Sequence, residues 1–240
     1  MNEAVIFAGG TGQRMNTRAK PKQFLEMHGK PVLIYTLQHF QEHKDIDKIV
    51  LVCVESWIKY AHKLAEEYHI DKLVSIVPGG STGQESIMHG LQKAWDVATG
   101  LNDIVLIHDG VRPMINGDLI SRCIDTVKKY GNAITITPAI ETVIIHGEGA
   151  RVENIFNRSC CAMARAPQCF YLKDIYTAHI QAKEEGILDF IDSATMMQHY
   201  GAELHTVEGP IENIKITTPT DFYLFRALLD AQENMQIVGI

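Results

Sequence analysis

The sequence contains no hydrophobic run long enough to cross a bilayer. Its apolar stretches, such as residues 104–107, fall far short of the about 20 residues that a transmembrane helix needs. The start of the chain also has no basic segment ahead of its apolar residues, as a secretion signal would have. We therefore expect a cytoplasmic protein with no membrane partner.

Cysteine is scarce and shows no metal-binding or redox spacing. The five cysteines include no C-x-x-C pair, so a zinc knuckle and a dithiol redox site are both excluded on spacing. We expect buried or unreactive thiols. The cysteines are Cys53, Cys123, Cys160, Cys161 and Cys169.

Positive charge is in deficit over the whole chain but concentrated near its start. The 22 Lys and Arg residues are outnumbered by 29 Asp and Glu residues, and the net charge of −7 argues against a nucleic-acid partner. Arg14, Arg18, Lys20 and Lys22 nevertheless lie within one short stretch. This stretch is expected to create a local positive field that suits an anion.

Short β-rich segments alternate with amphipathic helical segments in the first half of the chain. This alternation predicts an α/β protein whose mostly parallel sheet has helices on both faces. The chain of 240 residues has no linker, repeat or low-complexity tract, so we expect a single domain over residues 1–240. The expected strands are 3–8, 48–54, 73–77 and 104–108, and the expected helices are 31–43 (with Pro31 as first helical residue), 56–68 and 84–98.

The alternation stops near residue 133 and gives way to a predicted β-arm at about 139–160. Strands are expected at 133–138, 142–146 and 151–154, with a hairpin turn at 147–149. Beyond the arm we expect helices at 172–185 and 192–200 and strands at 203–207 and 213–216. A last helix is expected to begin with Thr218 as N-cap, Pro219 at the first helical position and Asp221 in a capping box.

A glycine-rich loop follows the first expected strand. The segment Ala8-Gly9-Gly10-Thr11-Gly12-Gln13-Arg14-Met15 exposes backbone N–H groups, and Arg14 and Lys22 supply positive charge beside it. It is not a Walker loop, because Gly-Lys-Ser/Thr is missing, and it lacks the third glycine of a dinucleotide fingerprint. We interpret it as a phosphate-binding loop, with a solvated surface turn as the alternative.

A second polar segment, His108-Asp109-Gly110-Val111-Arg112-Pro113, follows the fourth expected strand. The carboxyl ends of strands face the ligand crevice in open α/β sheets, so Asp109 is placed to bind Mg²⁺ and Arg112 to bind an anionic substrate. The alternative is an Asp–Arg pair that only fastens a loop.

Four segments together resemble a known family. They are Ala8 to Met15, Pro21-Lys22-Gln23-Phe24, His108 to Pro113, and Asn213-Ile214-Lys215-Ile216-Thr217-Thr218-Pro219. In this order they resemble the cytidylyltransferase family that includes 2-C-methyl-D-erythritol 4-phosphate cytidylyltransferase and ribitol-5-phosphate cytidylyltransferase. The resemblance implies a Rossmann-like fold, a homodimer that exchanges the β-arm, the substrates CTP and a polyol phosphate, Mg²⁺, and release of pyrophosphate.

The resemblance also implies a role for individual residues. It assigns catalysis to Arg14, Lys22 and Lys215, and the metal to Asp109. It assigns the acceptor to Arg112, to Arg158 from the neighbouring subunit, and more weakly to Thr142. The nucleotide-binding residues that it implies are Ala8, Gly9, Gly10, Gly12, Gly79, Gly80 and Ser86. No general base is needed, because the acceptor's phosphate oxygen is already a nucleophile at neutral pH.

The acceptor follows from smaller similarities. The Trp57-x-x-x-Ala61 pattern and Val111 resemble the ribitol-phosphate branch, so the expected reaction moves CMP from CTP to a polyol phosphate such as D-ribitol 5-phosphate. The alternative within the family is the methylerythritol phosphate reaction of isoprenoid synthesis. Use of UTP or another nucleotide is a third possibility.

Three positions depart from the pattern of both branches. Gly83 replaces the usual Arg, Arg165-Ala166-Pro167-Gln168 replaces Gln-Thr-Pro-Gln, and Ile191-Asp192 replaces Thr-Asp. Two acceptor-side hydroxyls are thereby lost, and such groups discriminate between substrates. The departures leave open another alditol or sugar phosphate as acceptor, and a non-catalytic nucleotide-binding module as a different class of function.

Overall fold

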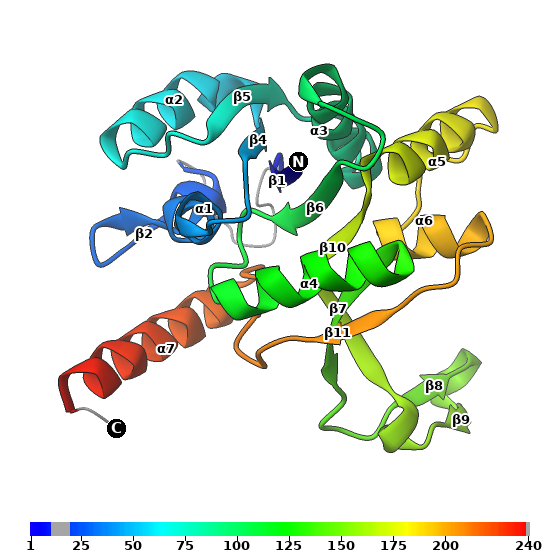
Figure 1. Cartoon of the computed structure of the whole chain (residues 1–240). Helices are drawn as coiled ribbons and strands as arrows, with labels where there is room; N and C mark the ends of the chain where they lie inside the picture. The colour runs from blue at the N-terminus through cyan, green and yellow to red at the C-terminus, as the bar shows by residue number, and fades with distance from the viewer. Residues whose placement is uncertain (11–19, 239–240) are drawn as a thin grey trace.

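A seven-stranded sheet forms the centre of the protein in the computed structural model, which describes residues 1–10 and 20–238 (Figure 1). The strands lie in the order β11-β7-β10-β6-β1-β4-β5, and β10 alone runs against its neighbours. Their bounds are β1 Asn2–Ala8, β4 Lys48–Cys53, β5 Leu73–Pro78, β6 Ile104–Asp109, β7 Asn132–Pro138, β10 Ala162–Tyr171 and β11 Thr206–Glu208. The mostly parallel sheet that the sequence predicts is confirmed.

Three adjacent strands, β6, β1 and β4, end at the same level. Phe7 in β1 pairs with Asp109 in β6, and Ala8 pairs with Cys53 at the end of β4. This register places the glycine-rich segment and the end of β6 side by side at the carboxyl edge of the sheet, where open α/β folds bind ligands.

Helices cover both faces of the sheet, as predicted. One core contains residues of α1 (Val32–Glu42), α2 (Ile58–Glu67) and α4 (Gly117–Tyr130), and the other contains residues of α3 (Gly83–Val97), α5 (Leu172–Glu184) and α6 (Ser193–His199). The last helix, α7 (Pro219–Val238), packs Phe225 against Met27 and Val32 in a third, smaller cluster. In the part of the chain that the structure describes, each helix falls short of the length or the apolar character needed to cross a membrane.

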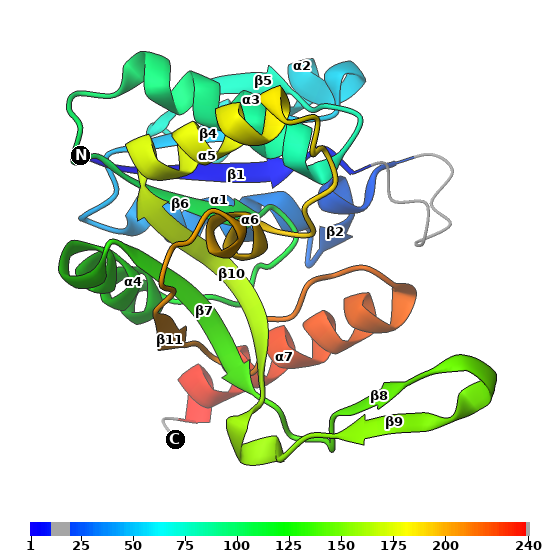
Figure 2. The same cartoon turned by 90° about the vertical axis from the view of Figure 1, so that its right-hand side faces the viewer.

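The predicted arm is a hairpin that projects from the sheet (Figure 2). Its strands β8 (Ile144–His146) and β9 (Val152–Ile155) pair only with each other. Apolar side chains remain exposed along it and at its base: Ile140, Ile144, Ile145, Val152, Ile155, Phe156 and Met163.

Several expected element boundaries are wrong. Residues 213–216 form no strand and instead cross the sheet edge as an irregular segment, in which the Ile216 N–H donates to the Val111 carbonyl. The strand expected at 203–207 is β11 at Thr206–Glu208, and Pro31 is the N-cap of α1 because it belongs to the short strand β3 (Lys30–Pro31). Helix α4 was not named from the sequence, and strand β10 was missed. The remaining short elements are β2 (Glu26–Met27) and the 3₁₀ turns Lys22–Phe24, Glu55–Trp57, Glu148–Ala150 and Arg158–Cys160.

The capping box at the start of α7 is confirmed. The Asp221 carboxylate accepts from the Thr218 N–H at 2.7 Å, and the Thr218 hydroxyl lies 3.4 Å from the Asp221 N–H. This reciprocal arrangement fixes where the chain turns from the irregular segment into the helix. It thereby positions Lys215, which lies just before it.

The cysteines are all free, but only some are buried. Cys53, Cys123 and Cys169 lie in the core, whereas Cys161 is half-buried and Cys160 is exposed on the arm. The expectation of buried or unreactive thiols is met by burial in the sheet and α4, and for the two cysteines of the arm it stays a prediction.

Candidate active site

Two adjoining pockets lie at the carboxyl edge of the sheet. The first, which we call the glycine pocket, has a volume of ≈ 350 Å³ and follows the ends of β1, β5 and β6. It brings together eight residues that the sequence singled out. The lining residues are Phe7, Ala8, Gly9, Gly10, Lys22, Gln23, Gly80, Ser81, Thr82, Gly83, Ser86, Asp109, Val111 and Lys215.

Backbone fills much of the glycine pocket's wall. A Cβ atom at Gly79 would lie 3.3 Å from both Gly9 Cα and Ser86 Oγ, so a side chain there would require the neighbouring loop to shift. Ser86 Oγ accepts from the Gly80 N–H at 3.0 Å and donates to the Thr82 carbonyl at 2.8 Å. The Ser86 hydroxyl thus holds the β5–α3 loop in shape beneath the pocket.

Gln23 also lines this pocket, and the sequence motif to which it belongs predicted no role for it. Its buried side-chain amide donates to the Ala8 carbonyl at 2.5 Å and to the Gly10 carbonyl at 3.4 Å. These bonds hold the end of β1, and Gln23 was overlooked because a single Gln after Lys22 carries no periodic signal. Gly12 and Arg14 lie outside the described residues.

Asp109 is the centre of an ion cluster at the base of the pocket. One carboxylate oxygen lies 2.7 Å from Arg112 Nε and the other 2.5 Å from Lys215 Nζ. Burial alone would raise the pKa of Asp109, but the Lys215 and Arg112 cations hold it below its usual value. The Asp–Arg pair considered from the sequence is therefore present, and it also fixes Lys215 over the pocket.

Arg112 and Lys22 tie the irregular segment to the sheet. Arg112 donates to the Asn213 carbonyl at 2.9 Å, and Lys22 Nζ donates to the Ile216 carbonyl at 2.9 Å. Three segments far apart in sequence thus converge on Asp109.

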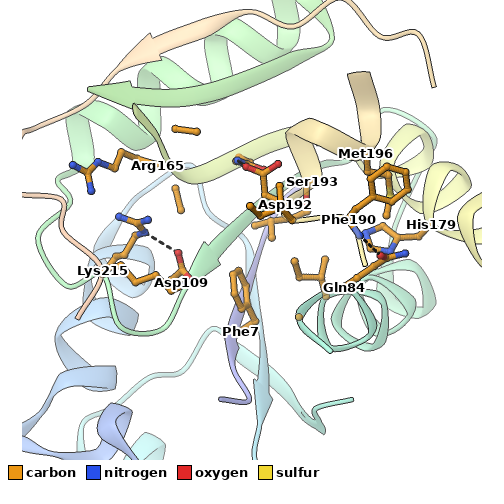
Figure 3. A pocket seen from close by; sticks show the side chains of 18 residues that line it. Phe7, Gln84, Asp109, Arg165, His179, Phe190, Asp192, Ser193, Met196 and Lys215 are labelled. Atoms are coloured by element: carbon orange, nitrogen blue, oxygen red, sulfur yellow. Dashed lines mark hydrogen bonds and ion pairs between the residues drawn. The ribbon is translucent and has the colours of Figure 1, made fainter. Parts of the chain in front are cut away.

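The second pocket, which we call the arginine pocket, has a volume of ≈ 280 Å³ and lies between β6, β10, α3 and α6 (Figure 3). Gln168 donates to Asp192 at 3.0 Å and accepts from the Ala194 N–H at 2.9 Å, so it anchors the start of α6. The lining residues are Phe7, Gly83, Gln84, Ile87, Ile107, Asp109, Arg112, Ala164, Arg165, Ala166, Gln168, His179, Phe190, Ile191, Asp192, Ser193, Met196 and Lys215.

The two pockets share one boundary. Phe7, Gly83, Asp109 and Lys215 line both of them. A ligand in one pocket can therefore reach a ligand in the other directly above the Asp109–Lys215 pair. Such an arrangement suits a transfer between two substrates.

The arm residues Thr142 and Arg158 are not brought to this boundary within one chain. Both line a separate, open hollow at the base of the arm, where Arg158 donates to the Ile140 carbonyl at 3.0 Å. Their side chains are exposed.

Asp109 fits Mg²⁺ as a single ligand and no more. It is the one carboxylate among the described residues that line the glycine pocket, and its oxygens already face two cations. Mg²⁺ commonly takes one or two protein carboxylates and completes its shell with substrate phosphates and water. Asp109 would thus supply one ligand, and the rest of the Mg²⁺ shell would have to come from bound substrate and water.

Comparison with known proteins defines the family. The sequence model of IspD, 2-C-methyl-D-erythritol 4-phosphate cytidylyltransferase, matches residues 3–231. The chain belongs to the IspD family of cytidylyltransferases. It is 50% identical, over 239 residues and 100% of both chains, to the ribitol-5-phosphate cytidylyltransferase of Vibrio parahaemolyticus. The 2-C-methyl-D-erythritol 4-phosphate cytidylyltransferase of Clostridium acetobutylicum is 39% identical over 95% of this chain and 97% of its own.

A solved structure of the IspD family shares the fold. The crystal structure of 4-diphosphocytidyl-2C-methyl-D-erythritol synthase from Anaerococcus prevotii matches with a TM-score of 0.81 at 28% identity, covering 95% of this chain and 98% of that one. The family and its Rossmann-like fold, both expected from the sequence, are confirmed, and the similarity to the ribitol-phosphate branch is the stronger one.

Proposed function

We propose that this protein transfers CMP from CTP to D-ribitol 5-phosphate, giving CDP-ribitol and pyrophosphate. The observation that carries the proposal is the shared boundary of the two pockets, where Asp109 and Lys215 stand between a backbone-lined cavity and one lined by arginines. The 50% identity to ribitol-5-phosphate cytidylyltransferases over the full chain supports D-ribitol 5-phosphate as the acceptor.

In this proposal the glycine pocket holds CTP. Backbone N–H groups around Ala8, Gly9 and Gly10 bind the triphosphate together with Lys22, and the family resemblance assigns Gly12 and Arg14 to the same ligand. The nucleoside lies against Gly79, Gly80 and the loop that Ser86 holds. The close approach of Gly9 to Gly79 supports this assignment, because it brings backbone of the β1 and β5 ends together at the pocket wall.

The chemistry needs positioning and charge more than proton transfer. An acceptor phosphate oxygen attacks the α-phosphorus of CTP, a new P–O bond forms, and the bond from that phosphorus to the bridging oxygen breaks as pyrophosphate leaves. Lys215 lies at the boundary and neutralises charge on the α-phosphate oxygens, while Asp109 keeps its ammonium group in place. Mg²⁺ held by the triphosphate and Asp109 would supply further neutralisation of the leaving pyrophosphate.

Pyrophosphate release tests the proposal. The purified protein is incubated with CTP, Mg²⁺ and, one at a time, D-ribitol 5-phosphate, 2-C-methyl-D-erythritol 4-phosphate and other alditol or sugar phosphates. We expect the highest kcat/KM with D-ribitol 5-phosphate. Faster turnover of another acceptor would overturn the acceptor assignment, and replacement of CTP by UTP, ATP or GTP tests the nucleotide in the same assay.

Lys22→Ala separates an enzyme from a non-catalytic nucleotide-binding module. We expect the variant to keep its fold, measured by circular dichroism, and to lose most of its turnover, because a cation beside the triphosphate is removed. A folded wild-type protein that binds CTP but releases no pyrophosphate with any acceptor would favour the module.

We further propose a homodimer in which each arm serves the neighbouring active site. The exposed apolar residues of the arm, such as Ile144 and Ile155, support an interface, and the separation of Thr142 and Arg158 from Asp109 supports exchange. The arm would then place Arg158 and Thr142 against the acceptor phosphate bound by the partner.

Subunit mixing tests this exchange. Lys22→Ala damages the body of a subunit and Arg158→Gln damages its arm, so a mixed dimer keeps one intact site if arms are exchanged. Mixing the two inactive variants should restore about a quarter of wild-type activity after re-equilibration. No restoration, despite mixed dimers shown by mass spectrometry, would place each arm at its own site.

A further inference from the structure

Arg165 is a half-buried cation that no carboxylate balances among residues 1–10 and 20–238. It lies in β10 at the edge of the arginine pocket, where its Nε donates to the Thr137 hydroxyl at 3.1 Å. A neutral hydroxyl satisfies one of its five N–H groups and none of its charge. Most of the guanidinium is therefore available to a ligand in the pocket.

The neighbouring charges make the imbalance larger. Arg112 and Lys215 share the single carboxylate of Asp109, and Asp192 uses its oxygens to accept from Thr195 at 2.8 Å and from Gln168. Burial and the nearby Arg112 both lower the pKa of Arg165, which shows that its charge is held at a cost. A bound dianion would remove that cost, and the planar guanidinium suits the oxygens of a phosphomonoester.

Uncharged polar atoms lie deeper in the same pocket. Ser193 and His179 are each only 3% exposed, and Ser193 Oγ and His179 Nε2 have no hydrogen-bond partner among the described residues. Burial lowers the pKa of His179 to about 4, so its imidazole is neutral and can exchange hydrogen bonds with a hydroxyl. Buried polar atoms of this kind are normally satisfied, and here a ligand can satisfy them.

The arrangement of these groups along the pocket matches a linear ligand that carries its charge at one end. Figure 3 shows Arg165, Asp109 and Lys215 at one side of the pocket and His179 at the other, with Ser193 between them. We propose that Arg165 binds the phosphate of the acceptor and that Ser193 binds one of its hydroxyls, both within the same subunit as Asp109. This inference rests on the proposed function and adds two specificity-determining residues to it.

Steady-state kinetics test the phosphate contact. Arg165→Gln removes the charge while keeping an amide that can reach Thr137. We expect the KM for D-ribitol 5-phosphate to rise about ten-fold or more, since hydrogen bonds to charged groups are among the strong ones, with the KM for CTP unchanged. The matched control is Arg226→Gln, an exposed arginine on α7 outside both pockets. An unchanged acceptor KM in a folded Arg165→Gln protein would overturn the proposal.

Calorimetric binding separates this inference from the proposed function. Wild-type protein is titrated with D-ribitol 5-phosphate and with ribitol in the absence of CTP. Suppose that wild type binds the phosphate ester, that Arg165→Gln binds it about ten-fold more weakly, and that neither protein releases pyrophosphate. This result would support the site while the proposed function fails. Normal turnover with equal binding by wild type and variant would overturn the site while the proposed function stands.

Ser193→Ala tests the hydroxyl contact. We expect the KM for D-ribitol 5-phosphate to rise about three- to ten-fold, and binding of inorganic phosphate to remain as in wild type. Arg165→Gln should instead weaken inorganic phosphate as much as the ester. If Arg165→Gln does not fold, Arg165→Lys tests the planar fork instead, because it keeps the charge, and an unchanged acceptor KM in that variant would overturn the contact between the fork and the phosphate. A Ser193→Ala protein with wild-type acceptor KM would remove Ser193 from the site.

Discussion

The glycine pocket and the arginine pocket differ in the groups that line them. The first has much backbone in its wall: a Cβ atom added at Gly79 would lie 3.3 Å from Gly9 Cα, and Gln23 holds the Ala8 carbonyl at the end of β1. The second is walled by side chains, among them Arg165, Gln168 and Ser193. Backbone groups are present whatever the residue, so the glycine pocket suits a ligand that stays the same when residues are substituted. Substitution of a side chain in the arginine pocket can instead change which ligand it binds.

The departures from the family pattern follow the same division. Ala166 and Ile191 line the arginine pocket only, and Gly83 lies at the boundary. The two positions at which a family hydroxyl is missing, 166 and 191, thus both belong to the arginine pocket. Ser193 and Arg165 offer polar groups in that same pocket, which can replace the missing hydroxyls.

The largest expected effect comes from the shared boundary. Lys215→Ala removes a cation that both pockets use and leaves Asp109 with Arg112 alone. We expect kcat to fall about 100- to 1,000-fold, as for loss of one group that stabilises transition-state charge. The control is Lys128→Ala, a lysine 59% exposed on α4. A fall below ten-fold would show that the two pockets do not meet at Lys215.

Gly79→Ala affects the backbone-lined half alone. Its Cβ would press on Gly9 Cα and Ser86 Oγ, so the KM for CTP should rise about ten-fold while the KM for the acceptor stays the same. Gly100→Ala, whose Cβ meets nothing within 4 Å, is the matched control. Equal changes in both KM values would mean that the pockets are not independent.

Asp192→Ala affects the side-chain-lined half. It removes the N-cap of α6 and the partner of Gln168, so the free energy of unfolding should drop by about 0.5–2 kcal/mol. The KM for the acceptor should rise a few-fold as α6 loosens, with no change for CTP. Asn116→Ala removes the corresponding cap of α4, which is outside both pockets, and should lower stability without changing either KM.

The smallest effect on turnover is expected for substitution of Glu3, which lies at the start of β1, at the opposite end of that strand from the pockets. Burial raises its pKa to about 7, with Lys48 opposing the shift, from an ordinary 4.5. The folded protein therefore holds a proton that the unfolded chain releases between these values, and the free energy of unfolding falls as the pH rises through this interval.

Urea denaturation at about pH 5 and about pH 8 measures the effect. Wild type should lose about 1–3 kcal/mol more than Glu3→Gln between the two pH values, and kcat and both KM values should be alike in the two proteins. A difference in KM would show that Glu3 is coupled to the pockets. Equal pH dependence of stability would mean that Glu3 is ionised in the fold.

The sequence predicts the backbone-lined half of the site better than the other half. A glycine loop after β1 and a polar segment after β6 follow from periodicity, and the register of β1 with β6 then brings Gly9 and Asp109 to one edge. The cap at Thr218 is equally local. These features depend on a few adjacent residues, which is why they could be predicted.

The arginine pocket could not be predicted because β10 was missed. Residues 162–171 contain Pro167 and mix Arg165 and Gln168 with apolar residues, and the strand has an irregular register with β7 between Ala164 and Gln168. Lys215 was expected on a strand and lies on an irregular segment held by tertiary contacts from Arg112. Contacts between distant segments leave no periodic signal in the sequence.

The antiparallel strand β10 supplies residues of the arginine pocket from within the sheet. Parallel strands deliver their functional residues in the loops after them, which tolerate insertions and deletions. Gln168 projects from a position that is paired on both sides, with Ile107 in β6 and Ile134 in β7, whereas Arg165 lies in the irregular stretch between Ala164 and Gln168. A change of chain length at Gln168 would shift the pairing of β10 with both neighbours, so this position can change only by exchange of its side chain, whereas the irregular stretch around Arg165 is free of that constraint.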